Sequence, residues 1–298
     1  MQKRARNREL ICALPPNALP RSKDNAILLL IATPTSKKKN SPPPAPTPHT
    51  HKKKTSSRAA QAAEKGGNEK ESVKAYFNEV GFERWSRIYS DSDDVNKVQR
   101  DIREGHAITV DKVLAWLQPD ARAGTSICDA GCGTGSLAIP LALKGAAVTA
   151  TDISAAMAGE AEKRYKDAIS SPGAPPAPPV APTFEAKCLE DVEGKYDVVC
   201  CIDVLIHYPQ ERVDEMLGNL ASRAGRKIVV SFAPSTPYYE VLKRVGELFP
   251  KGAKATRAYL HKEEDVEAAL QRKGWKVVRK EMTGTKFYFS RLFEAVPV

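Results

Sequence analysis

The sequence lacks the residue patterns of a metal-stabilised or disulfide-stapled protein. Its 298 residues include six cysteines and five histidines, but no C-x-x-C pair and no alternation of cysteine with histidine. Structural zinc sites and disulfide frameworks depend on such spacings, so we expect neither, and we assign no metal ligands. The apolar run at residues 26–32 is far shorter than the roughly 20 residues that cross a bilayer. We therefore expect a mature protein that is soluble or at most peripheral at a membrane.

Acidic residues are scarce only near the N-terminus. Residues 1–62 contain thirteen lysines and arginines but only two acidic residues. Removing these from the totals of 46 basic and 36 acidic residues leaves 33 and 34, a formal charge of −1 for residues 63–298. The net charge of +10 therefore belongs to the N-terminal segment. We expect no nucleic-acid partner, because the body of the chain has no basic excess.

The N-terminal segment also lacks the means to fold alone. It is rich in Arg, Lys, Ser and Thr and has five prolines between residues 42 and 48. Such a composition cannot bury enough apolar surface to form a core, and it is typical of organelle transit peptides. Residues 1–68 are therefore predicted to be a transit peptide and a disordered spacer. A basic linker or tail without targeting function is the alternative.

From about residue 72, stretches typical of strands and helices alternate. The predicted strands are 125–131, 146–152, 183–191, 196–203, 227–233, 275–284 and 286–296, and the predicted helices are 136–145, 154–169, 212–224 and 263–274. Ser154 is a candidate N-cap. The alternation predicts an α/β fold whose mostly parallel sheet carries helices on both faces, with a final antiparallel hairpin at its edge.

The loop DAGCGTG, residues 129–135, follows the first of these strands. Its three glycines allow a tight turn in which a ligand approaches the backbone closely. A dinucleotide site would require G-x-G-x-x-G, but Ser136 occupies the third glycine position. Asp152 ends the second strand, which is the usual place of a carboxylate that binds ribose hydroxyls. The sequence therefore predicts a nucleoside-containing cofactor rather than a nicotinamide dinucleotide.

This loop and Asp152 resemble those of the class I S-adenosylmethionine-dependent methyltransferases, and the resemblance covers residues 125–298. It implies a Rossmann-like sheet of seven strands with S-adenosyl-L-methionine across their carboxyl ends. The cofactor-binding residues implied are Asp129, Gly131, Cys132 and Gly133 near the methionine part, Asp152 at the ribose, and Ile153 and Met157 at the adenine. Glycines that serve only the turn, and a Met157 that serves only the core, are the alternatives.

Three further blocks, residues 76–89, 102–114 and 201–209, resemble the magnesium-protoporphyrin IX O-methyltransferases of plants, algae and photosynthetic bacteria. The match runs from about residue 72 to the C-terminus. It implies methyl transfer from S-adenosylmethionine to a propionate carboxylate of magnesium-protoporphyrin IX, giving the monomethyl ester in chlorophyll biosynthesis. The competing predictions are methyl transfer to a quinone or phenol, a dinucleotide-dependent oxidoreductase, and a non-catalytic cofactor-binding protein.

The chain departs from this family pattern at two places. In CLED, residues 188–191, Cys188 stands where the family has a carboxylate for the adenine amino group. The Leu189 backbone and Glu190 are the residues left to replace it. The second departure is the proline-rich insert 170–182, which we expect opposite the catalytic end and without a chemical role.

His207, after the fourth strand, is the first catalytic candidate. A free carboxylic acid with a pKa of about 4.3 is already ionised at pH 7, so a strong base is not required. Burial in an apolar pocket would raise that pKa, and a nearby histidine could then take or share the proton. A purely structural histidine bonded to the backbone is the alternative.

Residues 69–118 are predicted to form a helical N-terminal arm over the methyltransferase domain at 119–298. The resemblance implies that this arm is a lid and that Tyr89 acts in catalysis with the histidine. The helical spacing around Trp85 is also that of a plain core-facing helix. The weaker candidates for substrate binding, each of which could simply pack, are Tyr76, His106 and Tyr208.

Residues 233–264 form a long connection that we interpret as a substrate lid. Lys254 and Arg257 in it are candidates for pairing with the second propionate. The resemblance further implies a location in the chloroplast stroma, peripheral at most to the thylakoid or envelope, and magnesium chelatase as a partner. Any magnesium is expected in the substrate.

Overall fold

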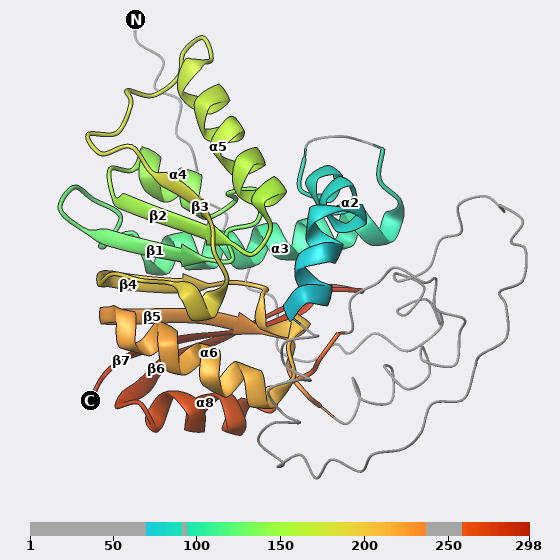
Figure 1. Cartoon of the computed structure of the whole chain (residues 1–298), viewed down its shortest axis with the longest axis vertical. Coiled ribbons are helices and arrows are strands. Elements are labelled where there is room, and N and C mark those ends of the chain that lie inside the picture. Colours follow the sequence, from blue (N-terminus) through green and yellow to red (C-terminus); the bar gives the residue numbers. More distant parts are fainter. Residues whose placement is uncertain (1–69, 91–93, 237–257) are drawn as a thin grey trace, which may run out of the picture.

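A computed structural model describes residues 70–90, 94–236 and 258–298. Its sheet has seven strands in the order β3-β2-β1-β4-β5-β7-β6 (Figure 1). The strands are β1 Ser126–Ala130, β2 Ala147–Asp152, β3 Thr183–Ala186, β4 Tyr196–Cys201, β5 Ala224–Phe232, β6 Trp275–Gly284 and β7 Phe289–Pro297. Neighbours among the first five strands are parallel, whereas β7 is antiparallel to both β5 and β6. The predicted class I methyltransferase fold, with its antiparallel C-terminal pair, is confirmed.

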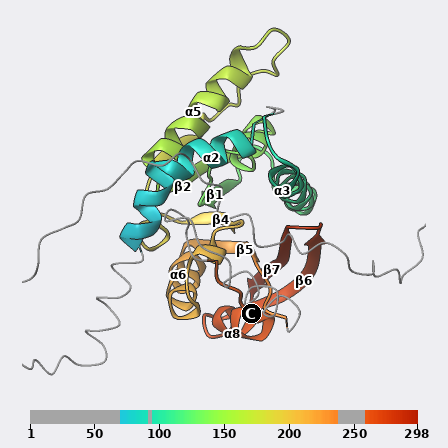
Figure 2. The ribbon, with the colours of Figure 1, turned by 90° about the vertical axis from the view of Figure 1, so that its right-hand side faces the viewer.

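Helices cover both faces of this sheet. They are α2 Val80–Ile88, α3 Lys97–Trp116, α4 Ala138–Leu143, α5 Ala155–Ser170, α6 Gln210–Arg223 and α8 Glu263–Gln271, and residues 70–78 are also helical. In Figure 2, α6 and α8 lie together on one side of the sheet and α3 lies on the other. The predicted segment 1–68, together with Lys254 and Arg257, lies outside the described residues.

The strand residues divide between two cores, as the period of two in a strand requires. Val199 and Cys201 of β4 belong to the core beneath α6 and α8, whereas Val198 and Cys200 belong to the core beneath α3 and α4. The five cysteines in the described part of the chain are free and buried. The cysteines of β1 and β4 therefore act as small apolar residues of these cores.

Local sequence signals set several boundaries correctly. Ser154 caps α5, because its hydroxyl accepts from the Met157 amide at 3.2 Å. Asn96 and Gln99 form a capping box that begins α3.

The third strand was predicted wrongly at its end. The prediction ran from 183 to 191, but β3 ends at Ala186 and Leu189–Asp191 form a 3₁₀ turn. The last residue of the neighbouring β2 pairs with Ala186, so the chain beyond it has no strand to continue along on that side. Asn219 of α6 instead donates to the carbonyl oxygens of Leu189, Glu190 and Val192.

Two helical glycines provide a test of the packing between α3 and the C-terminal strands. A Cβ atom at Gly105 would lie 2.3 Å from the Tyr288 ring, whereas one at Gly159 of α5 would meet nothing within 4 Å. We expect Gly105→Ala to lower the free energy of unfolding by about 1–3 kcal/mol through overpacking. Gly159→Ala, the matched control, should raise it by up to about 1 kcal/mol. Urea unfolding measures both, and a Gly105→Ala variant as stable as wild type would contradict the packing.

Candidate active site

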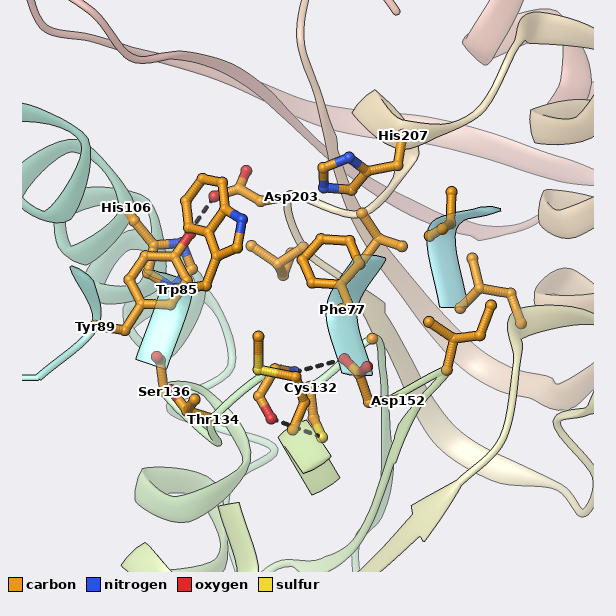
Figure 3. A pocket seen from close by; sticks show the side chains of 18 of the residues that line it. Phe77, Trp85, Tyr89, His106, Cys132, Thr134, Ser136, Asp152, Asp203 and His207 are labelled. Atoms are coloured by element: carbon orange, nitrogen blue, oxygen red, sulfur yellow. Dashed lines mark hydrogen bonds and ion pairs between the residues drawn. The ribbon is translucent and has the colours of Figure 1, made fainter. Parts of the chain in front are cut away.

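A pocket lies at the carboxyl edge of the sheet, where the chain leaves β1, β2 and β4 (Figure 3). It encloses about 790 Å³ of empty space, part of it open to solvent. Its walls come from the loop after β1, the segment around β2 and α5, the chain after β4 and the helices at residues 70–90. His106 of α3 and two residues after β3, Lys187 and Leu189, complete them.

The glycine loop is folded tightly against the end of β2. The Gly131 and Cys132 amides donate to the Thr151 carbonyl at 2.7 and 2.9 Å. Gly131 has φ 88°, and a Cβ there would lie 2.2 Å from a methyl of Val204. Only glycine fits this position, so the predicted role of this glycine in the turn has a steric reason.

Two buried carboxylates lie beside this loop. Asp152 accepts from the Gly133 amide at 3.0 Å and the Ser154 amide at 2.8 Å. Burial raises the pKa of Asp152 to about 6, although both amide hydrogen bonds act in the opposite direction. Burial, followed by the charge of Asp152, raises the pKa of Asp129 to about 7.

Asp129 also has an unsatisfied oxygen. No described residue hydrogen-bonds to its buried Oδ2 atom. Buried polar atoms are nearly always paired, so an exception beside a pocket indicates a ligand group. Asp129 lies in β1 and does not line the pocket itself.

Three of the four residues predicted to contact the adenine lie in the wall of the pocket. Ile153, Met157 and Leu189 line the pocket. Glu190 does not, because its carboxylate pairs with Arg212 of α6. Cys188 is also absent from the lining, and its thiol donates to Asp191. The pocket therefore offers an apolar wall next to the Asp152 carboxylate, with the unpaired Asp129 oxygen beside it, which suits a cationic nucleoside with free hydroxyl groups.

His207 closes the pocket opposite the glycine loop (Figure 3). It ends the short turn Leu205–His207 that follows β4. Its ring meets the Phe77 ring edge-on, with centroids 5.0 Å apart. Burial lowers the pKa of His207 to about 4, against the opposing effect of the Asp203 charge. The imidazole is therefore neutral near pH 7.

Tyr89 enters the pocket from the end of α2. Its ring stacks on His106, with centroids 4.4 Å apart and planes at 29°. Burial, followed by the Asp203 charge, raises the pKa of Tyr89 far above its usual value, so the hydroxyl keeps its proton. Arg164 of α5 holds this end of the helix by donating to the Tyr89 carbonyl at 2.7 Å and the Ser86 carbonyl at 3.1 Å.

Of the three weaker candidates for substrate binding, two line the pocket and one does not. His106 and Tyr208 line the pocket. Tyr76 does not, and its ring packs edge-on against Phe77 at 5.0 Å.

Several pocket residues escaped the sequence reasoning. Asp203 is the main one, since it lines the pocket and its Oδ2 lies 2.8 Å from His106 Nδ1. A carboxylate directly after a buried parallel strand was the available signal. The other residues missed are Val73, Phe77, Thr134, Ser136, Lys187, Ile202 and Val204.

No group of three or more His, Cys, Asp or Glu side chains in the described ranges is placed to hold a metal ion. In the same residues, no helix is both long and apolar enough to cross a membrane.

Comparisons with known proteins agree with this geometry. A family model described as magnesium-protoporphyrin IX methyltransferase C-terminus matches residues 201–297, and a methyltransferase domain model matches residues 127–224. The chain is 55% identical over 242 residues to the chloroplastic magnesium protoporphyrin IX methyltransferase of Arabidopsis thaliana, covering 81% of this chain and 75% of the relative. It is 49% identical over 230 residues to the magnesium-protoporphyrin O-methyltransferase of Synechocystis sp. PCC 6803, covering 77% and 96%.

The fold comparison leads to the same proteins. The crystal structure of magnesium protoporphyrin IX methyltransferase from Synechocystis PCC 6803 with bound SAH superposes with a TM-score of 0.68 at 48% identity, covering 76% of this chain and 98% of that one. The sequence identity is high over most of both chains. The pocket is also lined by residues from the segments that the two family models match. The chain belongs to the magnesium-protoporphyrin IX methyltransferase family.

Proposed function

We propose that this protein transfers a methyl group from S-adenosyl-L-methionine to a propionate carboxylate of magnesium-protoporphyrin IX, giving the monomethyl ester. One observation carries the proposal. Residues of the segment that matches the family-specific model, His207 and Asp203 among them, line the same pocket as the glycine loop. The glycine loop and the start of the segment that matches the magnesium-protoporphyrin IX methyltransferase model therefore share one pocket.

The residues around the loop fit the cofactor. When bound, S-adenosylmethionine supplies an activated methyl group. The unpaired Asp129 Oδ2 and the close backbone approach at Gly131–Gly133 would accommodate its methionine part, and Asp152 would bind its ribose hydroxyls. Ile153, Met157 and Leu189 would contact the adenine. Glu190 would stand at the edge of this set, because Arg212 pairs with its Oε1 whereas its buried Oε2 has no hydrogen-bond partner among the described residues.

His207 and Tyr89 are assigned to the substrate carboxylate. An ionised carboxylate needs no strong base, so the main requirement is to hold one of its oxygens in line for transfer. Neutral His207 can share a proton with a carboxyl group whose pKa rises in the apolar pocket. Tyr89 keeps its hydroxyl proton and can donate a hydrogen bond. His106 and Tyr208 line the same space and are assigned to contacts with the porphyrin.

We assign the wider organisation by the same reasoning. Residues 69–118 act as an arm over the pocket, since Phe77, Trp85 and Tyr89 line it. The chloroplastic relative supports a chloroplast location, with residues 1–68 as the targeting segment. The stroma, with peripheral membrane contact, and delivery of the substrate by magnesium chelatase complete the proposal. Residues 233–264 are assigned as a substrate lid.

The direct test is a methyl-transfer assay of the full-length protein. We expect radiolabelled methyl from S-adenosylmethionine to appear in an ester of magnesium-protoporphyrin IX, and not in catechols or quinols. Transfer to a phenol or quinol instead would replace this function with the alternative one.

His207→Ala tests the role of the imidazole. Loss of a group that orients and exchanges protons with the substrate should lower kcat by about 100-fold or more. Affinity for S-adenosylmethionine, measured by isothermal titration calorimetry, should be retained, because the predicted cofactor contacts lie across the pocket. A variant that forms ester at the wild-type rate would make His207 purely architectural.

Tyr89→Phe isolates one hydroxyl group. The ring stack on His106 is kept, so stability should not change, but a lost hydrogen bond to the reacting carboxylate should lower kcat about tenfold. Steady-state kinetics beside a thermal melt separate the two effects. Unchanged kinetics would exclude a hydrogen-bonding role for this hydroxyl.

Cofactor affinity should depend on pH. The pKa values of Asp152 and Asp129 are raised to about 6 and 7, so both carboxylates gain protons as the pH falls through 7 and 6. A cationic cofactor binds the ionised forms better, and its affinity should therefore fall with pH across this range. Asp152→Asn, which is a weaker binder, should show a flatter profile. Calorimetric affinities that stay constant in the wild type would contradict the assignment.

A further inference from the structure

Asp203 has a backbone conformation that residues with side chains rarely adopt. Its φ of 60° is the one positive value at a non-glycine position in the described part of the chain. Such a conformation costs on the order of 1–3 kcal/mol and persists only where the surroundings over-determine it. Asp tolerates it better than most residues, because its short side chain can hydrogen-bond locally. The strained residue also lines the pocket, so its position bears on function.

Four side chains hold the Asp203 carboxylate. Its Oδ1 accepts from the Ser231 hydroxyl of β5 at 2.8 Å and the Ser290 hydroxyl of β7 at 3.0 Å. Its Oδ2 accepts from the Tyr288 hydroxyl at 2.6 Å and from His106 Nδ1 of α3 at 2.8 Å. Burial acts to raise the pKa of Asp203, but these hydrogen bonds, His106 first, outweigh it and lower the pKa. The carboxylate is therefore ionised and acts only as an acceptor.

This contact fixes the imidazole of His106. Because the partner oxygen carries no proton, the proton of the contact sits on Nδ1, and Nε2 is left as the free ring nitrogen. The same ring stacks on Tyr89. No described residue hydrogen-bonds to the Tyr89 hydroxyl, so packing against His106 and Trp85 places this ring.

We propose that Asp203 is a positioning residue for methyl transfer, which fixes the orientation and tautomer of His106 and, through the stacked ring, the place of Tyr89 in the pocket. The inference rests on the proposed function. The titratable groups that face Asp203 are His106 on α3, Tyr89 after α2, Tyr288 before β7 and, through its charge, His207. Asp203 thus connects both proposed catalytic residues with the C-terminal strands.

A double-mutant cycle tests the route through His106. Asp203→Asn keeps the shape but replaces one acceptor oxygen with a donor. It should lower kcat about 10- to 100-fold, as loss of an outer hydrogen-bonding partner does. The affinity for S-adenosylmethionine should stay unchanged. His106→Phe keeps a ring to stack but cannot donate, and should show a similar loss.

The double variant distinguishes an effect of Asp203 that acts through His106 from an independent effect of Asp203 on the structure. Residues that act through one another are not additive, so Asp203→Asn with His106→Phe should lose no more than His106→Phe alone. Losses that multiply, or wild-type kcat in Asp203→Asn, would overturn the inference. If Asp203→Asn does not fold, the comparison of His106→Phe with wild type and the spectroscopic test below carry the decision.

Asp197 offers a matched control at the other end of β4. Its carboxylate accepts from the Ser126 amide at 2.8 Å, the Ser126 hydroxyl at 3.0 Å and Arg226 Nε at 3.1 Å, and it does not line the pocket. Asp197→Asn should lower the melting temperature and leave kcat intact. An equal loss of kcat in both Asn variants would show general destabilisation and count against the positioning role.

Nitrogen-15 NMR of the histidine side chains gives a readout that needs no activity. His106 should show a protonated Nδ1 in the wild-type protein and a changed signal in Asp203→Asn. A wild-type spectrum with the proton only on Nε2 would overturn the inference. Failure of the wild-type protein to form ester would instead overturn the proposed function, so the two failures are distinguishable.

Discussion

Three carboxylates at the carboxyl ends of the central strands constrain the pocket, because two are buried and one is partly buried, and each is satisfied differently. Asp129 of β1 keeps an unpaired oxygen and a pKa raised to about 7. Asp152 of β2 accepts from two backbone amides and has a pKa near 6. Asp203, just past β4, accepts from four side chains, and its pKa is lowered. The first two leave charge for a cationic cofactor, whereas the third is fully used inside the protein. The negative charge near the glycine loop is therefore left for a cationic ligand to balance. The negative charge of Asp203, beneath the arm, is already balanced by hydrogen bonds within the protein.

The arm depends on α5, the helix that follows β2. At its first turn, the Ser154 hydroxyl donates to the Phe77 carbonyl at 3.0 Å. Further along, Arg164 donates to the Tyr89 carbonyl and also lies 3.1 Å from the Thr134 hydroxyl of the glycine loop. One helix thus joins the cofactor loop, the arm and Tyr89. A change in the cofactor loop can reach the proposed catalytic tyrosine through packed and hydrogen-bonded groups.

Sequence patterns predicted the elements well where local chemistry decides them. The strands flanking the glycine loop, the Ser154 cap and the antiparallel closing strands follow from apolar periodicity and capping. The end of β3 did not, because its length depends on where its neighbour β2 stops. Among the site residues, the sequence and the family resemblance indicated His207, Tyr89 and His106, and the pocket contains all three. Glu190 and Tyr76 lie elsewhere, since Arg212 and Phe77 are their partners.

The sequence by itself determined the alternation of strands and helices, the glycine loop with its acidic neighbours, and the confinement of the basic excess to the N-terminal segment. These properties depend on residues close together in the chain. Only the tertiary structure decided which side chains meet. His106, Asp203 and Tyr288 are joined by hydrogen bonds across 85 to 97 residues of sequence. No local pattern encodes such contacts, because they arise when parallel strand ends, an N-terminal helix and a C-terminal strand converge on one edge of the sheet.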